Sequence, residues 1–147
     1  MIRLLQSRWR NNKTWGAEQA PLSLDKQARY ERDSVDLDIR QTGNICTLKV
    51  KGKFKSDSVR EFDSAVESAI ATGHIYLILD LENVPMLDSS AIGAVVNTLR
   101  LTKQVGGDTK LLNPSTFTTK TFKMVGILSL FGVYTLEADA VAACGTQ

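Results

Sequence analysis

Two adjacent serines that follow an aspartate have the clearest chemical potential in this chain. Ser89 and Ser90 come directly after Asp88, at the start of an apolar stretch with helical spacing. The first N–H groups of a helix lack intrahelical acceptors and the helix dipole is positive there, so a phosphoryl group would be stabilised. It would also add about two negative charges beside Asp88. The pattern fits a charge switch, and it also fits an ordinary helix cap formed by Asp88 or Ser89.

Few other residues are suited to catalysis. The chain has one histidine, His74, and no GxSxG, GxxxxGK[ST] or HExxH motif. His74 precedes an apolar run, whereas Asp88 and Ser89 follow it, which argues against a Ser-His-Asp triad. Cys46 and Cys144 lack the CxxC spacing of a zinc site or a disulfide framework. We therefore expect a protein that is not an enzyme, with no cofactor and no metal ion.

Composition indicates a soluble domain with an appendage. The chain has 147 residues, 43% of them apolar and 23% charged, and a net charge of +2. This excess of positive charge arises in the first twenty residues, so the remainder is nearly neutral and a nucleic-acid-binding face is not expected. The sequence has no apolar run of about 18 residues and no secretory signal pattern. We expect a cytoplasmic protein.

The first predicted elements form a hairpin. Alternating apolar and polar residues predict a half-buried strand over 35–40, with Val35, Leu37 and Ile39 on its inner face. The turn residues Thr42-Gly43-Asn44 follow, and a second alternating strand runs from position 46 to 51. Cys46 is expected to be a buried, small apolar residue of this strand.

Helices and strands then alternate along the chain. A helix is predicted over 58–72, with the Ser58 and Glu61 spacing of a capping box. A buried strand over 75–79 is expected to end at Asp80, and a second helix begins at Ser89. A strand over 110–112, a helix with apolar Phe117, a strand over 133–136 and a helix over 137–143 complete the order. The fold predicted is α/β: a mixed sheet with an N-terminal β-hairpin and parallel later strands.

A family resemblance adds to these expectations. The segment VPMLDSSAIGAV resembles the signature of STAS domains, the family of bacterial anti-sigma factor antagonists. The family pattern is a strand, a short loop, Asp-Ser-Ser/Thr-Gly and an apolar helix. Gly106-Gly107, Asn113-Pro114-Ser115 and the run from Phe122 to Phe131 resemble its second half. The resemblance implies a STAS domain over 34–147, preceded by a basic and polar extension over 1–33.

The resemblance also implies a function. Such proteins are non-enzymatic switches that bind an anti-sigma factor, which is a serine kinase, and release it once phosphorylated. The phosphorylated residue is expected to be Ser89, with Ser90 as the alternative acceptor. The partner-binding residues expected around this site are Asp88, Ser89, Ser90, Ile92, Lys53 and Lys55.

Two departures from the family pattern point to an alternative. Ala91 stands where the family usually has glycine, and its methyl group is expected to hinder the approach of a kinase. Gly52 lies among Lys51, Lys53 and Lys55, where many members carry acidic residues. We expect this loop near Ser89, either binding a phosphate or simply solvated. The alternative function is a STAS adaptor of a transporter-associated, stress or chemotaxis complex, without obligatory phosphorylation; nucleotide binding by the lysine loop is a third, weaker hypothesis.

The N-terminal extension allows two interpretations. Ile2, Leu5 and Trp9 have helical spacing beside arginines, which would suit a peripheral membrane contact or a partner groove. An isolated helix this short is marginal in water, so a frayed extension is the other interpretation. The sequence leaves open whether the chain forms a homodimer.

Overall fold

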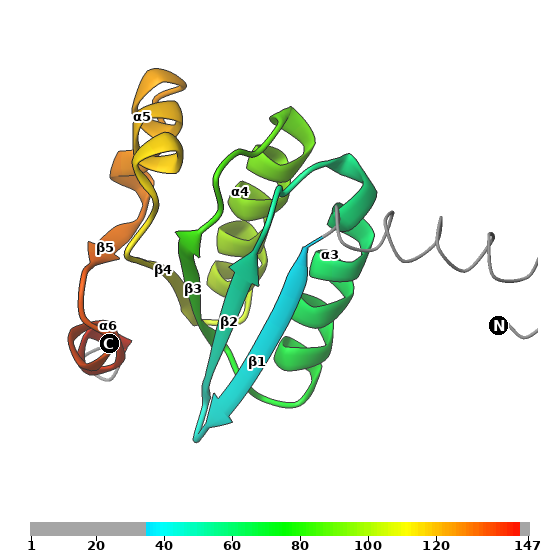
Figure 1. The fold of residues 1–147 in the computed structure, drawn as a ribbon. Coiled ribbons are helices and arrows are strands. Elements are labelled where there is room, and N and C mark those ends of the chain that lie inside the picture. The colour runs from blue at the N-terminus through cyan, green and yellow to red at the C-terminus, as the bar shows by residue number, and fades with distance from the viewer. Residues whose placement is uncertain (1–34, 145–147) are drawn as a thin grey trace, which may run out of the picture. The chain divides into compact units, whose positions relative to one another are not determined.

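The computed structural model describes residues 35–144, and its order of elements confirms the predicted one (Figure 1). The extension over 1–33, with the helix expected around Ile2, Leu5 and Trp9, lies outside the described residues. The elements are β1 (Asp36–Thr42), β2 (Ile45–Lys51), α3 (Ser56–Ala71), β3 (Tyr76–Asn83), α4 (Ser89–Gln104), β4 (Asp108–Leu112), α5 (Thr116–Met124), the short 3-10 helix η2 (Leu128–Leu130), β5 (Gly132–Tyr134) and α6 (Glu137–Cys144).

The five strands form one mixed sheet in the order β1-β2-β3-β4-β5. Strands β1 and β2 pair antiparallel through the two-residue turn Gly43-Asn44, where Gly43 has a φ of 59°. The other three pairings are parallel, and a helix lies between each pair of strands in sequence. The predicted hairpin and the predicted parallel strands are therefore both confirmed.

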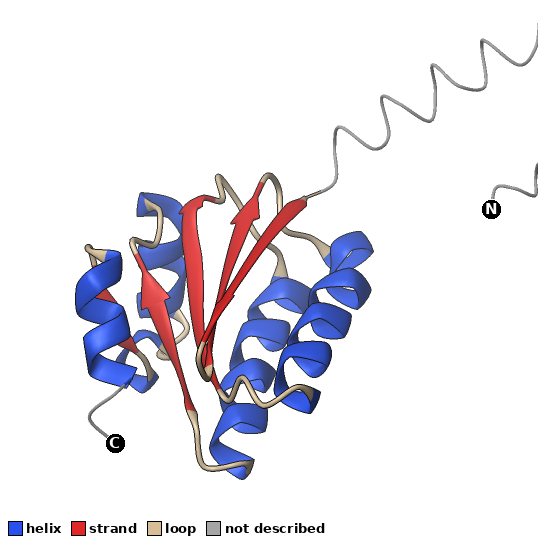
Figure 2. Cartoon of the chain, turned by 90° about the horizontal axis from the view of Figure 1, so that it is seen from below, coloured by secondary structure: helices blue, strands red, loops and turns tan. Residues whose placement is uncertain are grey.

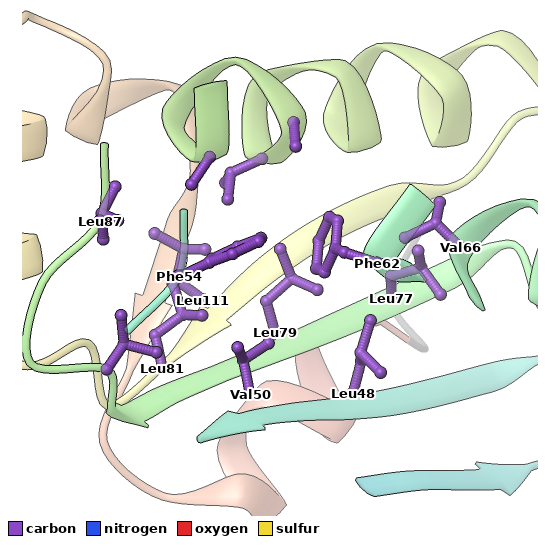
Figure 3. Close-up of a cluster of buried hydrophobic side chains, with 14 of the residues drawn as sticks. Leu48, Val50, Phe54, Phe62, Val66, Leu77, Leu79, Leu81, Leu87 and Leu111 are labelled. Atoms are coloured by element: carbon purple, nitrogen blue, oxygen red, sulfur yellow. The ribbon is translucent and has the colours of Figure 1, made fainter. Parts of the chain in front are cut away.

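Helices cover both faces of the sheet (Figure 2). Helices α3 and α4 pack on one face and enclose the main core, in which Phe54 and Phe62 lie 4.9 Å apart between ring centroids (Figure 3). Helix α6 covers the other face, where Ala140 and Cys144 pack against Tyr76, Ile78 and Leu112. Cys46 is buried in the main core, as predicted.

Strand β3 is longer than predicted. Asp80 does not end it, because the strand continues to Asn83 with a fully buried Leu81. Asp80 is tolerated inside the sheet since its register partner on β2 is Lys49, whose Nζ lies 3.9 Å from Asp80 Oδ2. The pattern of apolar residues predicts that the strand ends at the charged Asp80, but in the structure this charge is compensated by Lys49 of the neighbouring strand.

Two apolar patterns are more exposed than expected. On β1, Leu37 is only half-buried and Ile39 is 47% exposed, because this strand forms an edge of the sheet. On α5, Phe117 and Met124 are exposed, and Phe122 supplies the buried contact, stacked on Phe131 at 6.3 Å between centroids. Helix α5 therefore contributes only a narrow stripe to the core.

The Asp108–Lys110 ion pair should make stability depend on pH. Burial acts to raise the pKa of Asp108, but hydrogen bonds from Lys110 and from the Thr109 N–H lower it overall below its ordinary value of 3.8. A lowered folded pKa contributes stability above the unfolded value, and that stability is lost as pH falls through the folded pKa. Lys110 is only 9% exposed and Asp108 Oδ2 lies 2.8 Å from its Nζ.

We expect Asp108→Asn to lower the free energy of unfolding by about 1 to 3 kcal/mol at pH 7, because Lys110 loses a charged partner. The difference from wild type should shrink as the pH is lowered below about 4. Urea unfolding of both proteins, followed by far-UV circular dichroism at pH 7 and at a pH below about 4, measures this difference. A deficit that stays constant with pH would contradict the account.

Candidate functional site

The carboxylate of Asp88 caps two helices at once. Its Oδ1 accepts a hydrogen bond from the Ala91 N–H at 3.0 Å, which is the usual cap of α4. Its Oδ2 accepts one from the Ser56 N–H at 2.9 Å, in the first turn of α3. Helix α3 has Lys55 at its own capping position, and this residue provides no side-chain cap. Asp88 therefore supplies that cap from 32 residues away in sequence.

The predicted capping box of α3 is wrong. The helix begins at Ser56, two residues before the expected start, and Ser58 is buried inside its first turn. The Ser58 hydroxyl donates to Asp57 Oδ1 at 3.4 Å rather than capping an N–H group. Because Asp88 satisfies the Ser56 N–H from another loop, α3 can begin without a local cap.

The lysine loop lies against the segment that leads into α4. Backbone hydrogen bonds join Gly52 N–H to Asn83 O at 2.9 Å, Phe54 N–H to Met86 O at 3.0 Å, and Asp88 N–H to Phe54 O at 3.2 Å. Phe54 and Leu87 form a parallel bridge, and both side chains are buried (Figure 3). The expectation that this loop lies near Ser89 is therefore confirmed.

The opposite side of the same segment is held by the start of α5. Ser115 Oγ donates to Val84 O at 2.6 Å, and the Ser115 N–H donates to Leu81 O at 3.2 Å. The same hydroxyl accepts from the Thr118 N–H at 3.2 Å and so caps α5. The segment from Val84 to Asp88 is thus held between the starts of three helices.

Ser89 and Ser90 are exposed at the first two positions of α4. At these positions the helix provides no acceptor for the backbone N–H groups. Ala91 is 0% exposed, so its methyl group packs into the core and the expectation that it obstructs a kinase is wrong. Ile92 is half-buried against the main core, so only part of its side chain is exposed.

The charges around Ser89 are mixed, with positive groups prominent. The positive dipole ends of α3 and α4 meet at Asp88, and Lys53 is exposed beside them on the lysine loop. Lys55 is half-buried at the start of α3, where Asp57 adds a second carboxylate. These surroundings provide electrostatic compensation for an added dianion, although the neighbouring carboxylates oppose it.

The predicted site residues therefore fall into one cluster. Asp88, Ser89, Ser90 and Ile92 share the start of α4, and Lys53 and Lys55 lie on the loop bonded to it. His74 lies before the opposite end of β3, with Nδ1 2.9 Å from Thr72 Oγ1. Within residues 35–144, no group of three or more His, Cys, Asp or Glu side chains is arranged to hold a metal ion. In that same range no helix has the length and apolarity to cross a bilayer.

One contact in this cluster has only a weak signal in the sequence. The Ser56 N–H belongs to the site because it binds Asp88, yet a backbone donor carries no residue-type signature. A weak hint is the lack of any capping side chain at Lys55, which implies a cap from elsewhere in the fold.

The geometry agrees with comparison to known proteins. The STAS domain family matches residues 36–140. The chain belongs to the STAS domain family. An anti-sigma F factor antagonist from Lysinibacillus sphaericus is 30% identical over 87 residues, which cover 58% of this chain and 74% of that protein.

Solved structures support the same fold. The unphosphorylated form of the anti-sigma factor antagonist SpoIIAA has a TM-score of 0.66 and 24% identity, over 74% of this chain and 95% of that one. The phosphorylated form of the Bacillus cell fate determinant SpoIIAA has a TM-score of 0.62 and 23% identity, over 74% and 98% respectively. At these identities the likeness establishes the STAS fold.

Replacing Asp88 should destabilise this STAS domain through both helices. We expect Asp88→Ala to lower the free energy of unfolding by about 1 to 3 kcal/mol, because each lost cap costs about 1 kcal/mol. Asp88→Asn keeps one acceptor oxygen and should lose roughly half as much. Urea unfolding followed by circular dichroism measures both.

Ser89→Ala is the matched control for that series. It changes an exposed side chain one residue away and should stay within about 0.5 kcal/mol of wild type. If Asp88→Ala were as stable as Ser89→Ala, the capping of α3 and α4 by Asp88 would make no contribution to the stability of the fold.

Proposed function

We propose that this STAS domain is a phosphorylation-controlled antagonist of an anti-sigma factor. The unmodified protein binds its partner, a serine kinase, through the exposed start of α4, and phosphorylation of Ser89 releases it. The observation that carries the proposal is an exposed serine at the first position of α4, directly after the aspartate whose carboxylate caps both α3 and α4. The match to an anti-sigma F factor antagonist supports the class of partner. The protein acts by binding and not by catalysis.

The surface chemistry supports a switch of this kind. An unmodified Ser89 hydroxyl is small and neutral, so a partner can pack on it at little desolvation cost. A phosphoryl group adds about two negative charges at the same point, and a partner without a matching base then loses affinity. Asp88 is already committed to two N–H donors, so it holds the backbone of Ser89 in place before and after modification.

The other predicted residues receive separate roles in this proposal. Ser90 flanks the acceptor, and the exposed part of Ile92 provides an apolar contact for the partner. Lys53 and Lys55 form a basic border beside the same helix start. Because their charge is positive, this border selects a partner surface that is acidic where it faces the loop.

The alternative is a STAS adaptor that works without obligatory phosphorylation. The lysine loop favours it, since fixed positive charges beside Ser89 neutralise part of an added phosphate and so weaken its repulsive effect. In that case the start of α4 is a constant interface, and the protein assembles a transporter-associated, stress or chemotaxis complex.

Variants at Ser89 distinguish the two functions. Ser89→Ala should retain the kinase partner in an affinity pull-down from the native host. Ser89→Asp should weaken binding by at least about tenfold in a follow-up titration with the purified partner, because burying an uncompensated charge costs several kcal/mol.

Ser90→Asp is the matched control for position. It adds the same charge one residue along the exposed turn and should weaken binding less than Ser89→Asp. Equal effects at both serines would refute the assignment of Ser89. One set of partners shared by every bait would favour the adaptor.

Lys53→Glu tests whether the lysine loop binds the phosphate. In protein carrying phosphoserine at position 89, this change should lower the melting temperature, because an attractive contact becomes repulsive. The unmodified protein should change little, since Lys53 is exposed. Lys120→Glu on α5 is the matched control, as Lys120 is also exposed. Equal losses in the phosphorylated and unmodified forms of Lys53→Glu would exclude a phosphate contact.

A further inference from the structure

Strand β1 forms a long edge that pairs on one side only. Among residues 35–144, β2 is its only strand neighbour, and β1 extends over seven residues. The opposite edge strand, β5, has only three residues. Proteins usually shorten an edge or protect it with proline or lysine, because unpaired N–H and C=O groups recruit another strand. The sequence DLDIRQT of β1 contains neither, although three of its residues, Asp36, Asp38 and Arg40, are charged and carry both signs.

A groove of about 710 Å³ runs along this edge, between β1 and α3. Leu37, Ile39 and Gln41 line it from the strand, and Ile39 is 47% exposed. The helix lines it in part with the small residues Ser64 and Ala65, which leave room for an incoming side chain. The edge therefore combines unpaired backbone with exposed apolar surface.

The hairpin determines which residues of β1 point their backbone N–H and C=O groups away from β2, toward the open edge of the sheet. Residues Thr42 and Ile45 flank the two-residue turn and form its closing hydrogen-bonded pair, and such pairs alternate along an antiparallel ladder. The even-numbered residues of β1 thus bond to β2. Leu37, Ile39 and Gln41 direct their N–H and C=O groups away from the sheet.

The charges of β1 are complementary to themselves. If two copies of β1 pair antiparallel with Ile39 opposite Ile39, Leu37 lies opposite Gln41 and all the outward groups find partners. The same register places Asp38 opposite Arg40, twice, across the two-fold axis. Moving the two-fold axis by one residue shifts the register by two and places Asp38 opposite Asp38 or Arg40 opposite Arg40, and like charges destabilise such pairs.

We propose that the β1 edge binds a second copy of this chain, as an antiparallel pair of strands about a two-fold axis through Ile39. The two sheets then become one continuous sheet, and the Ile39 side chains meet where the two grooves adjoin. An isologous contact of this kind closes on itself, so it yields a dimer and not a fibre. It leaves the start of α4 free, because Ser89 belongs to neither β1 nor the groove.

Cysteine cross-linking in the full-length chain tests the register. Opposed residues of a hydrogen-bonded antiparallel pair have Cα atoms about 5.5 Å apart, which a disulfide can span. Ile39→Cys should form a disulfide-linked dimer under mild oxidation. Gln41→Cys should form much less, since its symmetry copy lies four residues further along the ladder. Val133→Cys, on the other edge strand and 43% exposed, controls for random collision. The native Cys46 and Cys144 are buried.

A charge swap tests the same contact without a covalent bond. Sedimentation velocity should show a dimer fraction of wild type that rises with concentration. Arg40→Asp should weaken the dimer by about tenfold or more, because two attractive pairs become repulsive. Combining it with Asp38→Arg should restore dimerisation. Glu137→Gln is the control, because it removes the Arg40–Glu137 ion pair and leaves the Asp38–Arg40 pairing intact.

A wild-type chain that stays monomeric at every concentration would overturn the proposal, whether its edge is empty or is covered by a strand from elsewhere. Equal cross-linking of the three cysteine variants, or no rescue by the double swap, would overturn it as well.

Discussion

The carboxylate of Asp88 is the contact on which the arrangement of this site depends. One side chain satisfies N–H donors at the starts of α3 and α4, two helices that pack side by side on the same face of the sheet. The loop over 52–55, which leads from β2 into α3, is hydrogen-bonded to the segment that leads from β3 into α4. The starts of both helices are therefore fixed to the ends of these two strands. Ser89 is therefore presented on a rigid turn. Its exposure results from the packing of Ala91 and Ile92 on the inner side of that turn.

The same arrangement concentrates positive charge around an exposed hydroxyl. Helix dipoles act mainly over the first turn, so the two dipole ends that meet at Asp88 influence Ser89 more than distant charges do. Lys53 and Lys55 add to this field, while Asp88 and Asp57 reduce it. If Ser89 is phosphorylated as we propose, this balance of charges decides how the phosphate behaves. A phosphate whose charge is neutralised by the groups around it would stay close to the surface of the domain, whereas one whose charge is not neutralised would repel a partner.

Much of the fold was predictable because local and global signals agree. The order of elements followed from periodicity, and the parallel strands followed from the helices between them. The position of Ser89 and its proximity to the lysine loop could also be predicted, since the carboxyl ends of parallel strands meet at one edge. The predictions that were wrong concern residues whose contacts come from distant parts of the sequence. Asp80 is compensated by Lys49 from the next strand, and Ser56 receives its cap from Asp88.

The predicted exposure of two side chains was wrong for the same reason. Sequence alternation on β1 could not indicate that the strand lies at an edge, so Ile39 was expected to be buried. The direction of the Ala91 methyl group depends on how α4 is rotated against the core, which the motif alone does not specify. These are consequences of tertiary packing, and they matter here because they separate an accessible Ser89 from a blocked one.

The most direct test of the central claim is mass-spectrometric mapping of phosphorylation on the full-length protein isolated from its native host. We expect phosphate on Ser89, in a stoichiometry that changes with growth conditions, and little or none on Ser90. A protein that is unmodified at Ser89 under every condition would contradict the switch and leave the start of α4 as a constitutive interface.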